Sequence, residues 1–502
     1  MNSIPRIVIA APRSGGGKTT FTCGLLKALQ LRGLRCAAFK CGPDYIDPLF
    51  HEQVAGATRG NLDLFFTDED TAKSLFVRGS EDCDIAVVEG VMGFYDGMSA
   101  TSPQASSYHL AKTLQAPVVL VLDAKGASLS LAAQVQGIAR FRPDANVQGV
   151  ILSRCSKSLC DMVAPVIQEE CGIPVLGCIP ANERFAIESR HLGLVTAAEI
   201  DDLEGRILDL AHQIEQTVDL DALIALAQGA PALEAEPYRT PRLTRSPLRL
   251  AIARDTTFCF YYAENLRALE DAGVQLVPFA PVQGETLPHD IDGLYLGGGY
   301  PELHAEALEA NTVLRTQVRE AVAAGLPTVA ECGGFMFLQQ RICDPEGTWH
   351  RMAGALPGEC RNLGKLRQFG YVTVTSQVDG LYGPAGTQWR AHEFHYWHST
   401  ENGADCTAKK PLRDTAWPCT KTASSLLAGY PHVYFASNPA VLEGFVGAME
   451  RFHATRTNLP LDASGTPKAQ EHGRGAEEQP GNPDAVQGHP AARSDAEGGS
   501  PC

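Results

Sequence analysis

The fold is decided first by the stretch Ile7-Val8-Ile9-Ala10-Ala11-Pro12-Arg13-Ser14-Gly15-Gly16-Gly17-Lys18-Thr19-Thr20. Its first four residues are continuously apolar, as in a parallel strand that is covered on both faces. A helical pattern follows from Thr20 to Leu31. Strand, glycine-rich turn and helix in this order predict a phosphate-binding loop (P-loop) at the edge of an α/β sheet.

The predicted nucleotide-binding residues are those of the loop itself, Ser14, Gly15, Gly16, Gly17, Lys18, Thr19 and Thr20. Glycines let backbone N–H groups turn toward phosphate oxygens, and Lys18 adds a positive charge. The strict GxxxxGK[ST] pattern has a glycine where this chain has Pro12. This difference argues against a generic NTPase but not against phosphate binding. A glycine-rich structural turn with a solvent-facing lysine is the alternative.

A magnesium site is predicted beside this loop. The Thr19 hydroxyl is one expected ligand, and Glu89, which ends a buried strand, is another because ligands of α/β sheets bind at the carboxyl ends of strands. Asp44, in the turn-rich segment Lys40–Pro48, is the third, and Asp47 is the next candidate. Helix caps or solvated loop charges are the alternative for these carboxylates.

The apolar pattern predicts α/β architecture throughout. Further continuous runs in the first part are Ile85–Val88, Val118–Leu122 and Val150–Leu152. They alternate with helical patterns, as in a doubly wound parallel sheet. We expect a first domain over residues 1–215, a Pro-rich linker over 216–247 and a second α/β domain over 248–450. Residues 461–502 have almost no aliphatic side chain larger than Ala, so we expect a disordered tail.

Composition and charge limit the partners and the cellular compartment that this chain can have. A net charge of −16 argues against nucleic acid as the main partner, although a local loop can still bind small anions. The chain lacks the pattern of a secretory signal, and no apolar run approaches the roughly 20 residues that span a bilayer. We expect a cytoplasmic protein with no membrane partner. The 15 cysteines, an odd number without close CxxC pairs, favour reduced thiols over disulfides or a metal cluster.

One cysteine, Cys332, differs from the others in its local sequence. Cys332 follows the short strand pattern Thr328-Val329-Ala330 and precedes Gly333-Gly334, which opens a helix. A nucleophile on such a turn is exposed to substrate and lies near backbone N–H groups that stabilise an oxyanion. A thiolate also needs a base, and the candidate is His432, about 100 residues further along. A buried core thiol and a loop histidine are the alternative.

At this point the sequence resembles a known family, the cobyrinate a,c-diamide synthases. The resemblance covers about residues 6 to 446. The motifs that carry it are Ser14–Thr20, Lys40–Pro48, Val88–Gly97, Arg190–Leu194, Leu296–Glu302, Ala330–Gly334 and His392–Tyr396. It implies a synthetase domain similar to dethiobiotin synthase, followed by a class I-like glutamine amidotransferase domain. It also implies ATP-dependent amidation of the a and c acetate carboxylates of cobyrinate with glutamine-derived ammonia, through acyl phosphates.

The resemblance also implies residue roles. Cys332 becomes the thioester-forming nucleophile and His432 its base. Other class I glutaminases have a glutamate two residues after this histidine, but here Tyr434 takes that position, so a Cys-His pair is expected. Gly298 and Gly299 become glutamine-binding residues, with a plain tight turn as the alternative. For His392, His395 and His398, spaced every three residues, packing or pocket roles are favoured over a metal site.

Other interpretations stay open. The acceptor would be a tetrapyrrole acid, and hydrogenobyrinate or nickel sirohydrochlorin would suit the same motifs; cobyrate synthase fits them less well. The first domain also resembles partitioning ATPases that act as switches, with Arg13 where those proteins have a signature lysine. A switch ATPase, however, has no need of a Cys332 domain. The expected partners are ATP, glutamine, the tetrapyrrole acid and Mg²⁺, with a homodimer left open.

Overall fold

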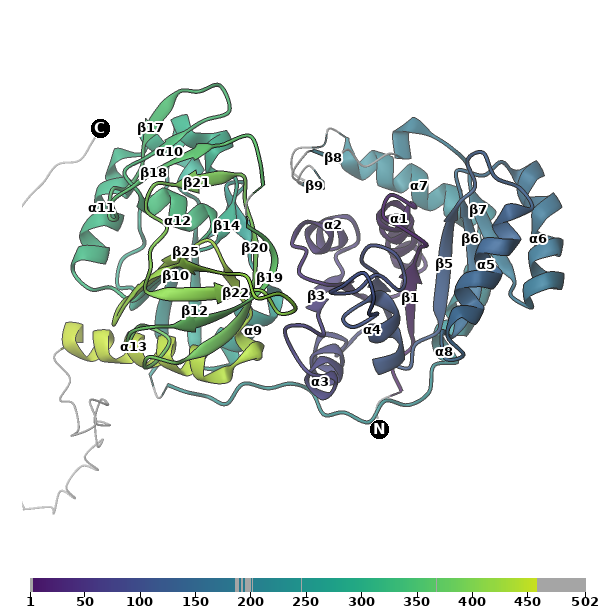
Figure 1. The fold of residues 1–502 in the computed structure, drawn as a ribbon, viewed down its shortest axis with the longest axis horizontal. Helices are drawn as coiled ribbons and strands as arrows, with labels where there is room; N and C mark the ends of the chain where they lie inside the picture. Colours follow the sequence, from purple (N-terminus) through teal and green to yellow (C-terminus); the bar gives the residue numbers. More distant parts are fainter. Residues whose placement is uncertain are drawn as a thin grey trace, which may run out of the picture. The chain divides into compact units, whose positions relative to one another are not determined.

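The computed structural model describes residues 3–185, 189–190, 193–194, 200, 202–244, 246–366 and 368–457. The predicted tail, 461–502, lies outside the described residues, as do His191 and Leu192 of one predicted motif. Contacts gather the described chain into one compact unit. Within this unit, each half of the sequence builds a sheet of its own (Figure 1).

The first half is a seven-stranded sheet with the order β3-β2-β4-β1-β5-β6-β7, in which every neighbouring pair is parallel. The strands are β1 (Arg6–Ala10), β2 (Cys36–Cys41), β3 (Thr58–Leu62), β4 (Ile85–Glu89), β5 (Val118–Asp123), β6 (Val147–Ser153) and β7 (Val175–Ile179). Strand β1 lies between β4 and β5, so the chain leaves β1 at the point where the strand order reverses. Ligands of open α/β sheets bind at such a switch point.

Helices cover both faces of this sheet (Figure 1). The helices are α1 (Lys18–Leu31), α2 (Ile46–Ala55), α3 (Glu69–Gly79), α4 (Ser107–Thr113), α5 (Ser130–Phe141), α6 (Lys157–Cys171), α7 (Leu203–Thr217) and α8 (Leu220–Gln228). Successive residues of β1 explain the two layers: Val8 and Ala10 join the core under α3 to α6, whereas Ile7 and Ile9 join the core under α1, α2, α7 and α8. Side chains of a strand alternate between faces, so a continuously apolar strand supplies two cores.

The linker prediction for residues 216–247 is partly wrong. Helix α8 lies inside that range, and its side chains Leu220, Leu223 and Ala227 are buried in the core of the first sheet. The prolines at 231, 237, 241 and 247 follow the helix and do not interrupt it. The connection between the two halves therefore begins after Gln228.

The second half is built on a six-stranded sheet with the order β12-β10-β13-β15-β25-β24. The strands are β10 (Leu248–Ala253), β12 (Val274–Phe279), β13 (Gly293–Leu296), β15 (Thr328–Glu331), β24 (Lys421–Ala423) and β25 (Leu426–Gly429), and only the edge strand β24 runs antiparallel to its neighbour. The helices of this half are α9 (Ala263–Asp271), α10 (Ala305–Ala310), α11 (Thr312–Ala323), α12 (Gly333–Leu338) and α13 (Pro439–Thr457).

Three smaller sheets accompany it. One has the order β23-β22-β19-β20-β26, with strands β19 (Phe369–Ser376), β20 (Gln388–Phe394), β22 (Cys406–Lys409), β23 (Ala416–Cys419) and β26 (His432–Val433). Another joins β16 (Arg341–Cys343), β17 (Trp349–Arg351), β18 (Glu359–Asn362) and β21 (Trp397–Ser399). A two-stranded ribbon pairs β11 (Phe258–Phe260) with β14 (Gly298–Gly299). Helix α12, which follows the cysteine-bearing strand β15, contacts β14 of the ribbon and β16 of the second small sheet.

The two halves meet through three tyrosines, of which Tyr262 and Tyr434 are buried. The Tyr262 hydroxyl donates to the Pro43 carbonyl at 3.2 Å, and the Tyr434 hydroxyl donates to the Asn61 carbonyl at 3.1 Å. The Tyr371 hydroxyl donates to Asp63 Oδ2 at 2.6 Å. These contacts bring the carboxyl ends of β2 and β3 against the second half.

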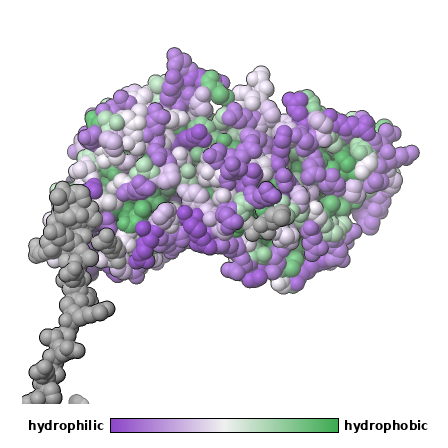
Figure 2. All heavy atoms as spheres, turned by 90° about the horizontal axis from the view of Figure 1, so that it is seen from below, coloured by the Kyte–Doolittle hydropathy of each residue, from purple (hydrophilic) through white to green (hydrophobic). Residues whose placement is uncertain are grey.

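The surface is mainly polar. On the face shown in Figure 2, hydrophilic residues predominate and hydrophobic ones form small separate patches. Within the part of the chain that the structure describes, no helix combines the length and the apolar character that crossing a membrane requires.

Candidate active site

The predicted phosphate loop connects β1 to α1 and needs its glycines for steric reasons. Gly15 and Gly17 have positive φ angles of 73° and 93°, a conformation that favours glycine. A Cβ on Gly16 would lie 3.0 Å from Ala11 Cβ, and one on Gly17 would lie 2.7 Å from Ser153 Oγ. The backbone therefore passes too close to its neighbours for a larger residue.

Lys18 begins α1 and turns back over the loop. Its ammonium group donates to the Met92 carbonyl at 2.6 Å and to the Arg13 carbonyl at 3.4 Å. Burial, followed by the charge of Lys40, lowers the pKa of Lys18 to about 8. Arg13 itself contacts Asp123 at 3.3 Å.

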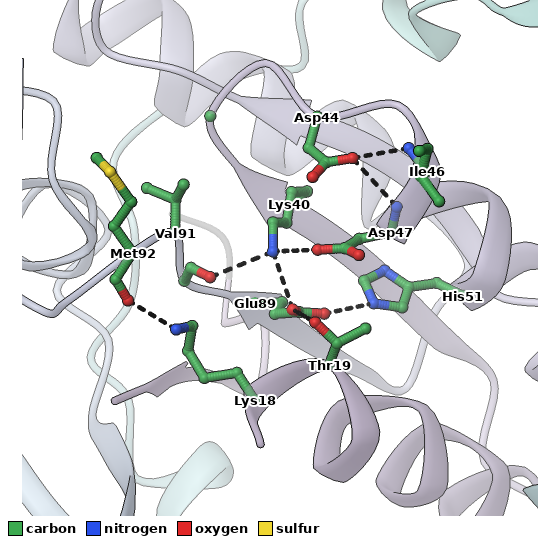
Figure 3. A network of polar contacts seen from close by, with 12 residues as sticks. Lys18, Thr19, Lys40, Asp44, Ile46, Asp47, His51, Glu89, Val91 and Met92 are labelled. Carbon is green, nitrogen blue, oxygen red and sulfur yellow. Dashed lines mark hydrogen bonds and ion pairs between the residues drawn. The ribbon is translucent and has the colours of Figure 1, made fainter. Parts of the chain in front are cut away.

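A buried polar network lies next to the loop, at the carboxyl end of β4 (Figure 3). The Thr19 hydroxyl donates to Glu89 Oε1 at 2.5 Å, and Lys40 Nζ donates to the same oxygen at 2.9 Å. The other oxygen, Oε2, lies 2.8 Å from His51 Nε2. Lys40 also forms an ion pair with Asp47. Burial alone would raise the pKa of Glu89, but Lys40 and His51 hold it well below its usual range.

Asp44 has a different set of contacts from Glu89. Its Oδ1 accepts the backbone N–H of Ile46 at 2.7 Å and of Asp47 at 3.3 Å, at the start of α2 (Figure 3). Thus Thr19 and Glu89 are in contact, while the Asp44 carboxylate accepts the first backbone N–H groups of α2. Asp47, the fourth candidate, lies deeper, beside Lys40.

The network suits Mg²⁺ by the chemistry of its donors. Thr19 and Glu89 offer hard oxygen ligands, and nowhere in the described ranges do three His, Cys, Asp or Glu side chains form a metal-binding group. Mg²⁺ is usually held by one or two protein oxygens and keeps waters and substrate phosphates as its other ligands. An incomplete protein ligand set next to a phosphate loop matches that preference.

Cys332 lies between strand β15, which ends at Glu331, and helix α12, in a conformation that few residues adopt. Its φ and ψ angles are 48° and −103°. Non-glycine residues in this region are strained, and nucleophiles on strand-to-helix turns share this property. The Gly333 backbone N–H hydrogen-bonds to the thiol, which lowers the pKa of Cys332, but burial and then the charge of Glu302 raise it well above its usual value. The group is thus a neutral thiol that needs a base.

His432 lies in β26 and packs on the two-stranded ribbon of β11 and β14, which contains Gly298 and Gly299. A Cβ on Gly298 would come within 2.2 Å of His432 Cε1, so the imidazole rests directly on the Gly298 backbone. Gly299 has a φ of 147°, and a Cβ there would lie 1.8 Å from the Thr257 carbonyl oxygen. Both predicted glutamine-pocket glycines are therefore sterically required, whatever ligand binds them. On the other side, the Tyr45 ring lies 4.9 Å from the His432 ring.

A carboxylate that the sequence analysis missed faces His432. Glu331 Oε2 lies 3.6 Å from His432 Nδ1 and accepts the Tyr295 hydroxyl at 3.0 Å, while Oε1 accepts the Val433 N–H at 3.0 Å. The structure therefore offers a third group behind the expected Cys-His pair, from a position directly before the nucleophile. Tyr434, which replaces the usual glutamate, instead bonds to Asn61.

One cavity of about 760 Å³ joins these elements. Its lining includes Cys332 and His432 from the second half, and Asp44 and Met92 from the first. His392 and His395 also line it, whereas His398 is buried beside His395, with the two ring centroids 4.9 Å apart. His395 stacks on Tyr430 with ring centroids 3.6 Å apart and lies 2.9 Å from Glu393, so its role is at least partly one of packing.

The comparisons with known proteins agree with this geometry. Residues 7–195 match the CobQ/CobB/MinD/ParA nucleotide binding domain, and residues 249–440 match the CobB/CobQ-like glutamine amidotransferase domain. The predicted order of a nucleotide-binding α/β domain and an amidotransferase domain is thereby confirmed. Together they make the chain a glutamine-dependent, amide-forming ligase that uses ATP as cosubstrate.

Relatives match over almost their entire length. The cobyrinate a,c-diamide synthase of Priestia megaterium is 38% identical over 88% of this chain and 96% of its own. Those of Syntrophotalea carbinolica and Salmonella typhimurium are each 39% identical over 88% of this chain and 98% of their own. A solved structure, chloroplast FtsY from Physcomitrella patens, matches 42% of this chain and 66% of its own at 18% identity, with a TM-score of only 0.28. On the evidence of these full-length relatives, the chain belongs to the cobyrinate a,c-diamide synthase family.

Proposed function

We propose that this chain amidates the a and c acetate carboxylates of cobyrinate with ammonia from glutamine, at the expense of ATP. The names of the relatives support the acceptor, and the two matched domains support the two half-reactions. The observation that carries the proposal is the shared cavity, which has Cys332 and His432 on one wall and Asp44 on the other. Ammonia released at the cysteine would enter the same space that borders the phosphate-binding half.

In the glutaminase half-reaction, Cys332 Sγ attacks the side-chain amide carbon of glutamine. His432 takes the thiol proton and transfers it to the leaving ammonia, and water then hydrolyses the thioester to glutamate. Glu331 Oε2, 3.6 Å from Nδ1, is too far away for a hydrogen bond but stabilises the imidazole when it is protonated, since a buried imidazolium needs a nearby negative charge. The Gly333 N–H already points at the thiol and is one expected oxyanion donor.

In the synthetase half-reaction, an acetate carboxylate of the acceptor attacks the γ-phosphorus of ATP. The resulting acyl phosphate has a good leaving group, which ammonia displaces to form the amide. The loop from Ser14 to Thr20 binds the phosphates, and Lys18 neutralises charge on the transferred group. Thr19 and Glu89 would hold Mg²⁺, with Asp44 completing the set; the ion would supply further charge neutralisation on the phosphates.

The acceptor would bind at the open side of the cavity. Phe369 and Leu412 line it with 53% and 52% of their surfaces exposed, and Lys410 and Arg413 lie beside them. Exposed apolar side chains with basic neighbours suit a broad macrocycle that carries several carboxylates. Hydrogenobyrinate and nickel sirohydrochlorin share this chemistry and stay alternatives. A switch ATPase is disfavoured because it would have no use for a glutamine amidotransferase domain.

The test compares nitrogen donors in Cys332→Ser. We expect this variant to lose glutamine-supported amidation and to keep ammonium-supported amidation, because only thioester chemistry needs the thiol. Equal loss with both donors would refute the assignment of Cys332. The same assay with cobyrinate, hydrogenobyrinate and nickel sirohydrochlorin identifies the acceptor, and an acceptor-independent release of ADP would favour the switch alternative.

Three further expectations belong to this proposal. We propose that the first domain extends to Gln228 and the second covers 248–450, with proteolysis confined to the connection between them. The substrates favour a cytoplasmic enzyme, which fractionation of the cells would check. A homodimer is tested by light scattering of the purified protein.

A further inference from the structure

Glu302 is a buried carboxylate on the wall of the shared cavity. It lies in the turn Pro301–His304, is only 5% exposed and lines the cavity together with Cys332. The turn is packed against Gly333, the residue after the nucleophile, since a Cβ on Gly333 would lie 3.0 Å from Pro301 Cδ. Glu302 is also the charged side chain with the largest effect on the pKa of Cys332. It is thus a neighbour of the reacting thiol.

Among the residues that the structure describes, Glu302 has no counter-charge: no Lys, Arg or His forms an ion pair with it, and its own backbone N–H is the donor that faces the carboxylate. Glu264, another buried glutamate, contacts Arg267 at 2.9 Å and accepts the Asn61 N–H at 3.1 Å. Burying a carboxylate without a partner is costly, and here burial raises the pKa of Glu302 to about 8. A partner from outside the chain would remove that cost.

We propose that Glu302 binds the α-ammonium group of glutamine and so selects this amide as the nitrogen donor. The inference rests on the proposed glutaminase role of Cys332. Glutamine carries one cation, and an ammonium group beside a desolvated carboxylate forms a strong, charge-assisted hydrogen bond. The same carboxylate, when ionised, repels the acetate groups of the acceptor and keeps them away from the thiol. Glu302 is therefore a specificity-determining residue and takes no part in bond breaking.

The test uses a glutamine analogue that lacks only the amino group. Glutaramate, the monoamide of glutaric acid, has the same amide and carboxylate but no α-ammonium. We expect the wild type to prefer glutamine in kcat/KM. In Glu302→Gln, kcat/KM for glutamine is expected to fall by at least about 30-fold, the loss typical of removing one charge from a buried pair. The value for glutaramate should stay nearly unchanged, so that the preference disappears.

Controls separate the possible failures. Glu306→Gln changes an exposed glutamate four residues away, on α10, and should leave both substrates unaffected. Ammonium-supported amidation in Glu302→Gln should fall far less than glutamine-supported amidation, because Glu302 selects the nitrogen donor and takes no part in acceptor activation. Equal loss with glutamine and glutaramate, or an unchanged preference for glutamine, would overturn the inference. If Glu302→Gln fails to fold, Glu302→Asp, which withdraws the carboxylate but keeps its charge, should reduce the same preference. A Cys332→Ser enzyme that still hydrolyses glutamine would instead refute the underlying function.

Discussion

The most direct test of the glutaminase geometry is the substitution Gly298→Ala. The φ angle of Gly298 lies outside the left-handed region, so its backbone accepts alanine without strain. The new methyl group would come within 2.2 Å of His432 Cε1, whereas ordinary contacts begin at about 3.5 Å. The imidazole must therefore move by about 1 Å. The ring is only 3% exposed and can yield only toward the cavity that it lines, away from its present position.

The expected magnitude follows from that displacement. A shift of about 1 Å in a catalytic group typically costs about 100-fold in rate, and overpacking a buried site typically costs about 1–3 kcal/mol of stability. We therefore expect glutaminase kcat/KM to fall by about 100-fold while the protein stays folded. Ammonium-supported amidation should be unchanged, since the phosphate loop and Glu89 do not contact this glycine.

The assay measures glutamate release, ammonium-supported amidation and melting temperature on one preparation. Gly137→Ala is the matched control: Gly137 lies in α5, where a Cβ meets nothing within 4 Å. It should retain full activity and gain a little stability, because alanine favours helices. Full glutaminase activity in a folded Gly298→Ala enzyme would show that the position of His432 on this ribbon does not matter.

The remaining predictions address the other groups. Lys18→Ala should abolish amidation with either nitrogen donor, measured as ADP release, while leaving glutamine hydrolysis in place; normal ammonium-supported turnover would contradict the nucleotide site. Glu331→Gln should lower glutaminase kcat by roughly 100-fold with little change in KM, because His432 loses the negative partner that faces its Nδ1; an unchanged kcat would reduce Glu331 to a packing role. The raised pKa of Glu302, about 8 against about 4.5 unfolded, means that its protonated form stabilises the fold below pH 4.5 and that this stability is lost as pH rises through 8. Glu302→Gln should therefore match the wild type in urea unfolding at pH 4.5 and exceed it at pH 9, by at most about 5 kcal/mol. Removal of residues 461–502, which have almost no aliphatic side chain larger than Ala, should not change turnover or melting temperature.

Much of the fold could be predicted because its signals are local. The strand at Arg6–Ala10, the glycine turn and helix α1 can each be predicted from residues that are close together in the sequence. The same holds for the turn at Cys332. Helix α8 was missed because its short apolar segment leads into a series of prolines, which resembled a linker as a whole. The antiparallel sheet containing β19 and β20 was also not predicted, since its position depends on contacts with distant loops.

The supporting residues of the site could not be predicted for a related reason. His51 and Glu89 are 38 positions apart, and Glu331 and Val433 are 102 apart, so their contacts exist only in the folded chain. A local clue existed in one case: Asp47 and His51 are one helical turn apart in α2, on the face that reaches Glu89. For Glu331 the sequence offered only its position before Cys332. Only the fold brings β26 beside the end of β15, where the Glu331 carboxylate faces His432.

The shared cavity determines which variants can separate the two half-reactions. Residues on its wall, such as Asp44 and His432, face a space that both reactions border, so a change in their size or charge can affect either one. Gly298 and Glu331 do not line that space. Gly298 packs against the His432 ring and Glu331 faces its Nδ1, both from outside the cavity lining. Substitutions at these two supports therefore change the position or charge of one catalytic group while the cavity keeps its lining. Loss of glutamine hydrolysis with intact ammonium-supported amidation in both variants would show that the supports serve only the cysteine site, and a joint loss would show that the two sites are mechanically coupled.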